Sequence, residues 1–450
     1  MLFKKMTISV PLPNLAFPFD TAQEVERLRD AYKVSGQAQE VSFRALVPWM
    51  KVGERATHYL HSYPAKLLPH IAHFFLAASN VSKKDDIVLD PFGGTGTVVL
   101  EAALAGHHAL YSDSNPLARL ISGVKTRPLG NEELLQGYEC ILHRFKLSRA
   151  RTPPDVVNIN HWFEPKTIRD LCRLKASVDA EEKLDIRSFF LATFSAIVRK
   201  VSLADPRLSV PVKLKAYEGA RTPKVVSVIE AFNDQFHSNL RRMSKLQQLN
   251  AHLPEVRCCG IDARSLKHDG GEPLASESIG LIITSPPYAG AQKYIRASSL
   301  NLGWLGLISS NRLRSLEDLN IGREHLPKSQ YSTVIPTGVP EADSALAEIF
   351  LVNPLRSAIA AMYLIEMRQA LTEAARVLKK GGRLILVIGN NEVCGREFKS
   401  SDYLQYICEE VGLNIELKLI DAIKSRGLMT KRNRSASLIT REWVLVFKKL

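Results

Sequence analysis

The sequence has 450 residues, of which 45% are hydrophobic and 24% are charged, and its formal net charge is +14. A chain of this length and composition can bury a large core, which excludes wholesale disorder. It contains no apolar stretch long enough to span a bilayer, and prolines interrupt the apolar residues near the N-terminus, so we expect a cytoplasmic protein. The positive excess suits a polyanionic partner, because each phosphate that is neutralised releases counterions.

Metal or disulfide chemistry is not indicated. The six cysteines form no C-x-x-C pair, which argues against a zinc ribbon or a disulfide framework and favours a reducing compartment. His58 and His61, and separately His70 and His73, have the i, i+3 spacing of helical metal ligands. No cysteine or carboxylate cluster in the sequence completes a ligand set, so we predict no metal site and structural or substrate-facing histidines.

Clear strand and helix patterns begin after an N-terminal segment. Residues 1–56 mix prolines with one helical pattern, TAQEVERLRDAY, and are predicted to pack as an extension on the core. Residues 57–127 contain a helical apolar stripe starting near Lys66, and then two successive strand–turn–helix units, DIVLD-PFGGTGT-VVLEAALAG and HALYSDSNPLARLIS. Two β-α units in succession predict a parallel, doubly wound α/β sheet.

The remaining sequence alternates between insertions and core. Residues 128–255 are predicted to be a mainly helical insertion with basic loops, and residues 256–288 return to strand patterns. Residues 289–353 form a second insertion that has few strand signals. Residues 354–450 complete the core with a long helix, a Gly-Gly turn, a strand and two β-rich runs, which we expect to form an antiparallel end of the sheet.

The segment DPFGGTGT predicts a ligand site at the carboxyl end of a strand. Gly94 and Gly96 permit positive φ and close backbone approach, and the exposed N–H groups of the next helix suit a carboxylate such as that of S-adenosylmethionine. Asp90 and Asp113 stand at strand ends where a carboxylate can accept from ribose hydroxyls, and Asp262 could take an adenine amino group. The turn lacks the third glycine of nicotinamide-binding motifs. Alone, such a turn could equally be a strand–helix connection without a ligand.

The segment TSPPY, from Thr284 to Tyr288, predicts chemistry on an exocyclic amine of a base. Such an amine is a poor nucleophile because its lone pair is delocalised into the ring. The Ser285 hydroxyl and the Pro286 carbonyl can accept its hydrogens, and the two prolines, Pro286 and Pro287, would fix these acceptors. Tyr288 offers a face for a flipped base, worth about 1–3 kcal/mol of stacking. Attack on a sulfonium methyl then needs no covalent intermediate. The simpler interpretation is a rigid loop with an aromatic lid.

DPFGGTGT together with TSPPY resembles the amino-methyltransferase family of DNA-modifying enzymes, which carry D-P-F-x-G-x-G-T and [S/D/N]-P-P-[Y/F/W] motifs. The resemblance implies a Rossmann-like class I S-adenosylmethionine-dependent methyltransferase sheet with a helical insertion. It also implies S-adenosylmethionine as cofactor, base flipping in double-stranded DNA and, in a restriction-modification system, a cognate endonuclease as partner. The serine form of the second motif goes mostly with N4 of cytosine. The candidate cofactor-binding residues in and after the glycine turn are Asp90, Phe92, Gly94, Thr95, Gly96, Thr97, Asp113 and Asp262.

A third segment, HSYPAKLLPHI, is similar to the family's upstream cofactor segment, which lies against the methionine moiety. On that match Tyr63, Pro64 and Lys66 are candidate cofactor neighbours. The cofactor motif precedes the catalytic motif, with a long insert between them, as in the branch of the family that places target recognition there. Residues 128–255 are therefore the candidate target-recognition region. Many N4-cytosine members have the reverse order, so N6 of adenine stays open as the target.

Other chemistries were weighed against this interpretation. C5-cytosine methylation is excluded, because it needs a cysteine after a proline and none of the six cysteines has one. An RNA guanine-N2 methyltransferase uses a similar P-P-Y loop, with Asp or Asn first. A non-catalytic nucleic-acid-binding subunit is disfavoured by the intact motifs. The basic loop from Lys424 to Arg434 and the insertion residues Arg149, Arg151, Arg199 and Arg221 could contact phosphates or lie in solvent.

Overall fold

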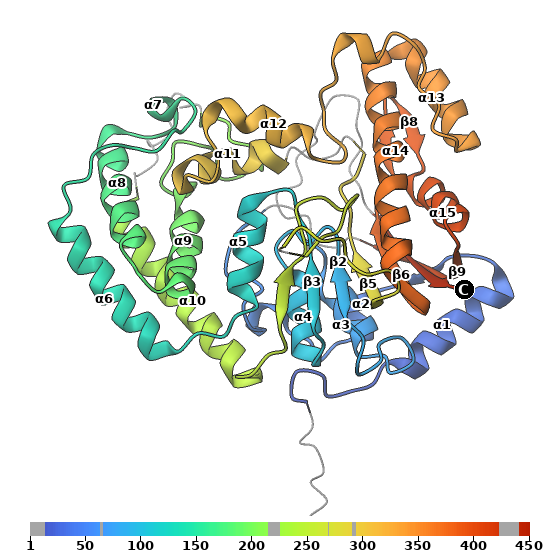
Figure 1. The fold of residues 1–450 in the computed structure, drawn as a ribbon, viewed down its shortest axis with the longest axis horizontal. Helices are drawn as coiled ribbons and strands as arrows, with labels where there is room; N and C mark the ends of the chain where they lie inside the picture. The colour runs from blue at the N-terminus through green and yellow to red at the C-terminus, as the bar shows by residue number, and fades with distance from the viewer. Residues whose placement is uncertain (1–13, 64–65, 215–225, 269, 290–293, 423–440) are drawn as a thin grey trace, which may run out of the picture.

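A computed structural model describes residues 14–63, 66–214, 226–268, 270–289, 294–422 and 441–450 (Figure 1). Eight strands in these residues form one sheet with the spatial order β1-β9-β10-β6-β5-β2-β3-β4. Neighbouring strands are parallel, except that β10 runs antiparallel to β6 and to β9. The strands of this sheet are β1 (Gln39–Val41), β2 (Val88–Asp90), β3 (Ala109–Tyr111), β4 (Val256–Cys258), β5 (Ile279–Thr284), β6 (Leu378–Ile388), β9 (Leu413–Ala422) and β10 (Arg441–Lys449).

Helices cover both faces of the sheet, which explains why its central strands are apolar at every position. All six residues of β5 are buried, and successive residues point to opposite faces, so Ile282 packs with one helix layer and Ile283 with the other. The helices of the Ile283 side are α1 (Ala22–Ser35), α2 (Phe43–Leu46), α3 (Pro69–Leu76) and α4 (Thr97–Ala105). Those of the Ile282 side are α14 (Pro354–Val377) and α15 (Ser400–Glu410). The predicted doubly wound α/β fold and its antiparallel end are confirmed.

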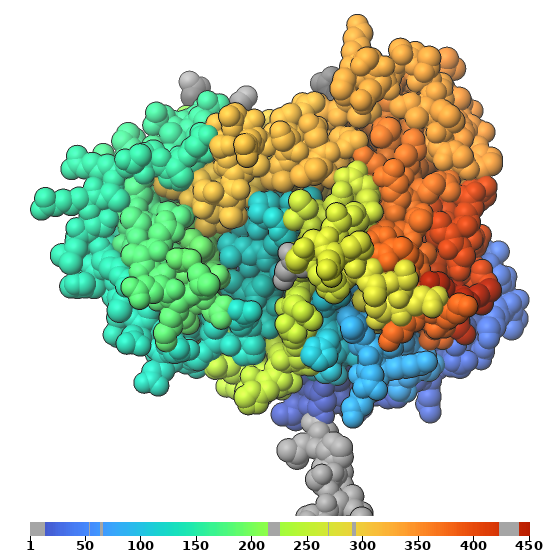
Figure 2. Space-filling model, viewed as in Figure 1, coloured from blue at the N-terminus to red at the C-terminus, as the bar shows by residue number. Residues whose placement is uncertain are grey.

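The helical insertion forms a lobe beside the sheet, on the left in Figures 1 and 2. Its apolar cluster includes Phe190 and Phe236, and it also takes in α5 (Pro116–Lys125) of the core and Trp304 of α11 (Tyr294–Leu305). The helix that follows the TSPPY segment is thus buried in this lobe. The insertion helices are α6 (Asn131–Leu147), α7 (Ile159–Trp162), α8 (Pro165–Asp179), α9 (Leu184–Val198) and α10 (Val228–Leu249).

The second insertion runs from the lobe back to the core. After α11 it crosses the top of the molecule in Figure 2, and it ends in a helix that packs on α14. Its remaining elements are η2 (Ser310–Arg312), α12 (Leu313–Asp318), η3 (Lys328–Gln330) and α13 (Pro340–Val352). The elements of the described chain that remain are η1 (Val52–Glu54), near the N-terminus, and the hairpin of β7 (Asn391–Val393) and β8 (Arg396–Phe398).

Two local predictions differ from the structure. The described part of the N-terminal segment, residues 14–56, does not only pack on the core, because β1 adds a parallel edge strand beside β9. The expected turn at Gly381 and Gly382 is wrong, since both residues lie within β6, where the register with β5 shifts. A Cβ on Gly382 would lie 2.9 Å from the Gly280 carbonyl oxygen, so the glycine permits a close approach of two strands at an irregularity.

Within the described residues, no helix is both long and apolar enough to cross a membrane.

Candidate active site

The glycine turn and the TSPPY loop begin side by side, because β2 and β5 are neighbouring parallel strands. At their carboxyl ends Thr284 Oγ1 donates a 2.7 Å hydrogen bond to Asp90 Oδ1. The Phe92 amide donates to the same oxygen at 3.1 Å. Burial raises the pKa of Asp90 to about 7, although these hydrogen bonds oppose the shift. The two motifs, 194 residues apart in sequence, are therefore joined by a direct side-chain contact.

Two glycines give the turn its shape. Gly94 (φ 50°) and Gly96 (φ 69°) both adopt left-handed backbone conformations, and Gly96 precedes the first residue of α4. A Cβ on Gly96 would lie 2.8 Å from Ser122 Oγ, so α5 packs directly against this glycine. Among the described residues, a Cβ on Gly94 would meet only the Phe92 carbonyl oxygen, at 3.8 Å, which leaves space for a ligand to approach the backbone. The neighbouring Thr95 and Thr97 are buried.

Asp113 closes this turn from the adjacent strand. It lies two residues beyond β3 and accepts 2.8 Å hydrogen bonds from the amides of Gly94 and Asn115. Desolvation raises the pKa of its carboxyl, and the same backbone hydrogen bonds oppose that rise. The two carboxylates, Asp90 and Asp113, thus flank the glycine turn, which is the placement expected for groups that bind a nucleoside.

Asn115 is a site residue that the sequence reasoning missed. Its buried amide donates to Tyr63 Oη at 3.0 Å and to Ser298 Oγ at 3.1 Å, and its own oxygen caps α5 through the amide of Leu117. Ser298 belongs to α11, which follows the TSPPY loop. Asn115 therefore joins the segment around Tyr63 to that helix. The D-S-N-P sequence carried a signal, since Asn followed by Pro is a common helix start.

The upstream segment is held by polar contacts, some of them buried. Lys66 Nζ donates to the His61 carbonyl oxygen at 2.6 Å, and the His61 ring lies 3.0 Å from Ser195 Oγ of α9. Nearby, Lys125 Nζ donates to the Thr95 carbonyl oxygen in the glycine turn at 2.7 Å. Burial lowers the pKa of Lys66 to about 8 and that of Lys125 well below its usual value. Pro64 lies outside the described residues.

The TSPPY loop, Thr284 to Tyr288, begins at the last residue of β5. Pro286 is buried, and Ser285, Pro287 and Tyr288 are partly buried. The Tyr288 hydroxyl donates a 3.0 Å hydrogen bond to Glu442 of β10, another residue that sequence reasoning missed. Burial raises the pKa of both Tyr288 and Glu442. Strand β10 thus holds the far end of the loop, whereas Asp90 holds its start.

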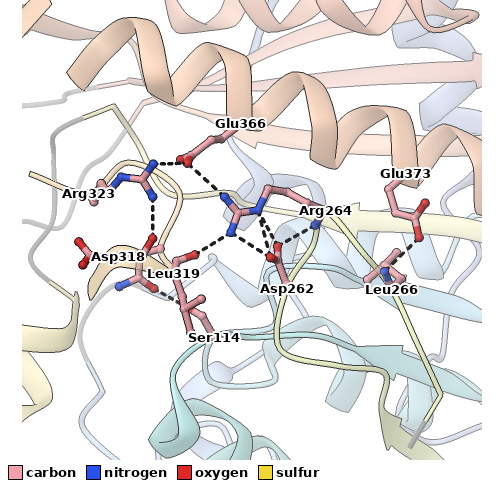
Figure 3. A network of polar contacts seen from close by, with 10 residues as sticks. Ser114, Asp262, Arg264, Leu266, Asp318, Leu319, Arg323, Glu366 and Glu373 are labelled. Atoms are coloured by element: carbon pink, nitrogen blue, oxygen red, sulfur yellow. Dashed lines mark hydrogen bonds and ion pairs between the residues drawn. The ribbon is translucent and has the colours of Figure 1, made fainter. Parts of the chain in front are cut away.

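Asp262, the third predicted carboxylate, lies four residues beyond β4 and not at the strand end. Its two oxygens accept from the Arg264 side chain at 2.8 and 2.9 Å (Figure 3). Arg264 in turn reaches Glu366 of α14. The carboxylate of Asp262 is therefore part of an ionic network, and its predicted contact with an adenine stays a prediction.

A buried ionic cluster surrounds Glu101 of α4, the helix that follows the glycine turn. Glu101 accepts from Nε and Nη2 of Arg55 at 2.7 Å, from His58 at 2.7 Å and from His73 at 3.1 Å. Burial alone would raise the pKa of Glu101, but Arg55 and the two histidines hold it well below its ordinary value. Burial lowers the pKa of His58 to about 4. These two histidines, which have metal-like spacing to His61 and His70, serve a structural network.

The candidate phosphate-contacting residues differ in their surroundings. Arg199 donates to the carbonyl oxygens of Asp205, Leu208 and Ser209, so its guanidinium orders the loop after α9 and does not face a phosphate. Arg149 and Arg151 are exposed. Arg221 and the basic loop Lys424–Arg434 lie outside the described residues.

Glu101→Gln should lower the free energy of unfolding by roughly 3–5 kcal/mol, because Arg55 would lose its buried counter-charge. Denaturant unfolding followed by circular dichroism would measure it. Glu24→Gln is the matched control: Glu24 pairs with Arg27 on the exposed surface of α1, and such a pair contributes about 1 kcal/mol or less. Equal effects of the two substitutions would show that the Glu101 cluster contributes no more than a surface ion pair.

Comparison with known families gives the class of this site. Residues 57–125, which span the upstream segment, the glycine turn and α5, match the family model described as RMKL-like, methyltransferase domain. This part of the chain is therefore similar to a methyltransferase domain.

Similar proteins span more of the chain. The type II methyltransferase M.MvaI of Kocuria varians is 24% identical over 368 residues, which are 75% of this chain and 77% of that protein. Among solved structures, a SAM-dependent methyltransferase from Methanosarcina mazei aligns with 86% of this chain and 99% of its own, at 11% identity and a TM-score of 0.32. A Thermus thermophilus protein described as a putative DNA modification methylase, complexed with S-adenosyl-L-methionine, aligns over 42% and 51% of the two chains, at 20% identity and a TM-score of 0.20.

Proposed function

We propose that this methyltransferase transfers a methyl group from S-adenosylmethionine to N4 of a flipped cytosine in double-stranded DNA. The observation that carries the proposal is the contact between Thr284 and Asp90, which sets the S-P-P-Y loop beside the glycine turn. A methyl donor held at the turn and an amine held at the loop would then meet at one point. The serine form of the motif favours cytosine.

The residues around the turn fit the methyl donor. S-adenosylmethionine supplies an electrophilic methyl group on a sulfonium. The open backbone at Gly94 admits a ligand, and Asp113 lies where a carboxylate can accept from ribose hydroxyls. The N-terminal amides of α4 and the amine of Lys66 offer hydrogen-bond donors for the cofactor carboxylate. Tyr63, next to Asn115, would lie against the methionine moiety.

The loop supplies the complementary chemistry. The Ser285 hydroxyl and the Pro286 carbonyl would accept the two hydrogens of the amine and so favour a tetrahedral nitrogen with a free lone pair. The two prolines limit backbone motion, and the Asp90–Thr284 hydrogen bond fixes the start of the loop. With these acceptors in place before the base arrives, little reorganisation is needed during the reaction.

DNA as the substrate is supported by the similarity to M.MvaI and by the net charge of +14. We propose that the helical insertion, residues 128–255, reads the target, and that a cognate restriction endonuclease is the partner. One observation favours a second candidate, N6 of adenine: the cofactor motif precedes the catalytic motif, and many N4-cytosine enzymes have the reverse order.

Nucleoside analysis tests this function. The full chain is incubated with S-adenosylmethionine and DNA of mixed sequence, and the product is digested and separated by mass spectrometry. We expect N4-methylcytosine. N6-methyladenine would replace the cytosine proposal by the second candidate. Methylation of structured RNA at N2 of guanine, with unmodified DNA, would contradict the substrate class.

Tyr288→Ala should raise the KM for DNA by roughly 5- to 100-fold, because the flipped base loses a stacking partner worth about 1–3 kcal/mol. Steady-state kinetics on a DNA substrate would measure it. Tyr288→Phe is the matched control: it keeps the ring and removes only the hydroxyl, which contacts Glu442 and Ser285. If Ala and Phe had the same effect, the hydrogen bond and not the ring would explain the role of Tyr288.

A further inference from the structure

A short segment of the second insertion touches both halves of the proposed site. We call residues 319–323, which follow α12, the strap. At one end, the Asn320 side chain is hydrogen-bonded to Ser114 Oγ, next to Asp113. Further along, Gly322 has a φ of 78°, and a Cβ there would lie 3.6 Å from the Tyr288 carbonyl oxygen and 3.8 Å from Pro287 Cβ. The strap therefore spans from the turn after β3 to the backbone of the catalytic loop.

One carboxylate of α14 holds this strap (Figure 3). Glu366 Oε1 accepts from Arg323 of the strap at 2.5 Å and from Arg264 at 3.1 Å. Arg264 also donates to the Leu319 carbonyl oxygen at 3.3 Å, so the two ends of the strap are tied to the same carboxylate. Asp262 completes the network by orienting Arg264 from the opposite side.

Because this network is largely buried, its ion pairs affect the stability of the strap. The side chain of Glu366 is 5% exposed, and those of Arg264 and Arg323 are each 18% exposed. A charge buried to this extent is stable only while its partners are present, so losing one partner leaves the others uncompensated. Helix α14 packs along the sheet and is a rigid base for Glu366. The strap, a loop of an insertion, takes its position from this anchor.

We propose that Glu366 is a positioning residue for the catalytic loop. Acting through Arg323 and Arg264, it holds the strap against Pro287 and Tyr288, and so fixes the two acceptors, the Ser285 hydroxyl and the Pro286 carbonyl. A displacement of about 1 Å at such acceptors can reduce a rate about 100-fold. The effect on the reaction rests on the proposed function, whereas the effect on the loop does not.

The experiment compares Glu366→Gln and Arg323→Met with the wild-type chain, without DNA or cofactor. Hydrogen exchange of peptides covering residues 278–289 and 313–326 should become about 10-fold faster in both variants. Arg368→Met is the matched control, since Arg368 lies on the same helix and pairs with Glu410 away from the loop. It should leave both peptides unchanged. Arg323→Met removes one arm of the network and leaves Glu366 paired with Arg264, so it tests the proposal even where Glu366→Gln disturbs folding.

Kinetics on DNA supply the second readout. The turnover number should fall about 10- to 100-fold in both variants, with the Kd for S-adenosylmethionine within about twofold of wild type. Arg323→Lys should recover part of the rate, because it keeps one ion pair. Faster exchange confined to the strap, with an unchanged catalytic loop, would overturn the proposal. So would a parallel loss of cofactor affinity and turnover. A wild-type chain that methylates no DNA would overturn the proposed function alone, since the exchange result stands without a substrate.

Discussion

Ser285→Ala should reduce the rate of methyl transfer by about 10- to 100-fold, because the amine would lose one of its two hydrogen-bond acceptors in the transition state. The Kd for S-adenosylmethionine should change by less than about twofold, since the cofactor contacts proposed for the turn lie on other segments. Single-turnover transfer of a labelled methyl group to DNA would give the rate, and calorimetry would give the Kd.

Ser278→Ala provides the comparison for that result. Ser278 precedes the opposite end of β5, and its hydroxyl bonds only to the nearby Ala275 carbonyl oxygen. We expect wild-type rates for this variant. Equal losses of cofactor affinity and rate in Ser285→Ala would show that the serine shapes the site and does not act on the amine.

Gly96→Val should weaken S-adenosylmethionine binding by at least about 100-fold. A Cβ on Gly96 would lie 2.8 Å from Ser122 Oγ and 3.0 Å from Ser122 Cα, so either the turn or α5 must shift. The left-handed conformation adds strain that a β-branched residue cannot relieve. Equilibrium dialysis with labelled cofactor would measure the affinity, and circular dichroism would verify that the variant folds.

The other end of the same helix supplies the control for Gly96→Val. Gly106 also has positive φ, but a Cβ there would meet no atom of the described part of the chain within 4 Å. Gly106→Ala should therefore cost roughly 1–2 kcal/mol of stability and leave cofactor affinity intact. Retained affinity in Gly96→Val would mean that the cofactor does not approach the backbone at this turn.

Local sequence predicted the parts of the site that depend on neighbouring residues. The apolar run before Ser285 and the β-branched run before Gly94 each indicate a strand followed by a functional loop, and both strands are present. The doubly wound pattern also predicts that carboxyl ends of parallel strands share one edge. The hydrogen bond between Thr284 and Asp90 is consistent with that expectation.

The missed residues act through contacts that no local pattern encodes. Glu442 is 154 residues from Tyr288 in sequence, and it reaches the loop only because β10 pairs with β6. Glu366 lies within a long helix, and a charged residue in a helix normally indicates a face exposed to solvent. Glu101 was likewise hidden in the apolar stretch VVLEAALAG, so the histidines that bind it could not be assigned a partner. Strand β1 was not predicted because its three residues, none of which is buried, carry no periodic signal.

The structure of the chain bound to an analogue of S-adenosylmethionine would test most directly whether the glycine turn and the TSPPY loop form one site. In this analogue an amine replaces the methyl-bearing sulfonium. We expect that amine to lie within about 6 Å of the Pro286 carbonyl oxygen, the distance left for one hydrogen bond and one in-line attack. An analogue bound away from Gly94, or with its amine directed away from Ser285 and Pro286, would contradict a methyl-transfer site between the two motifs.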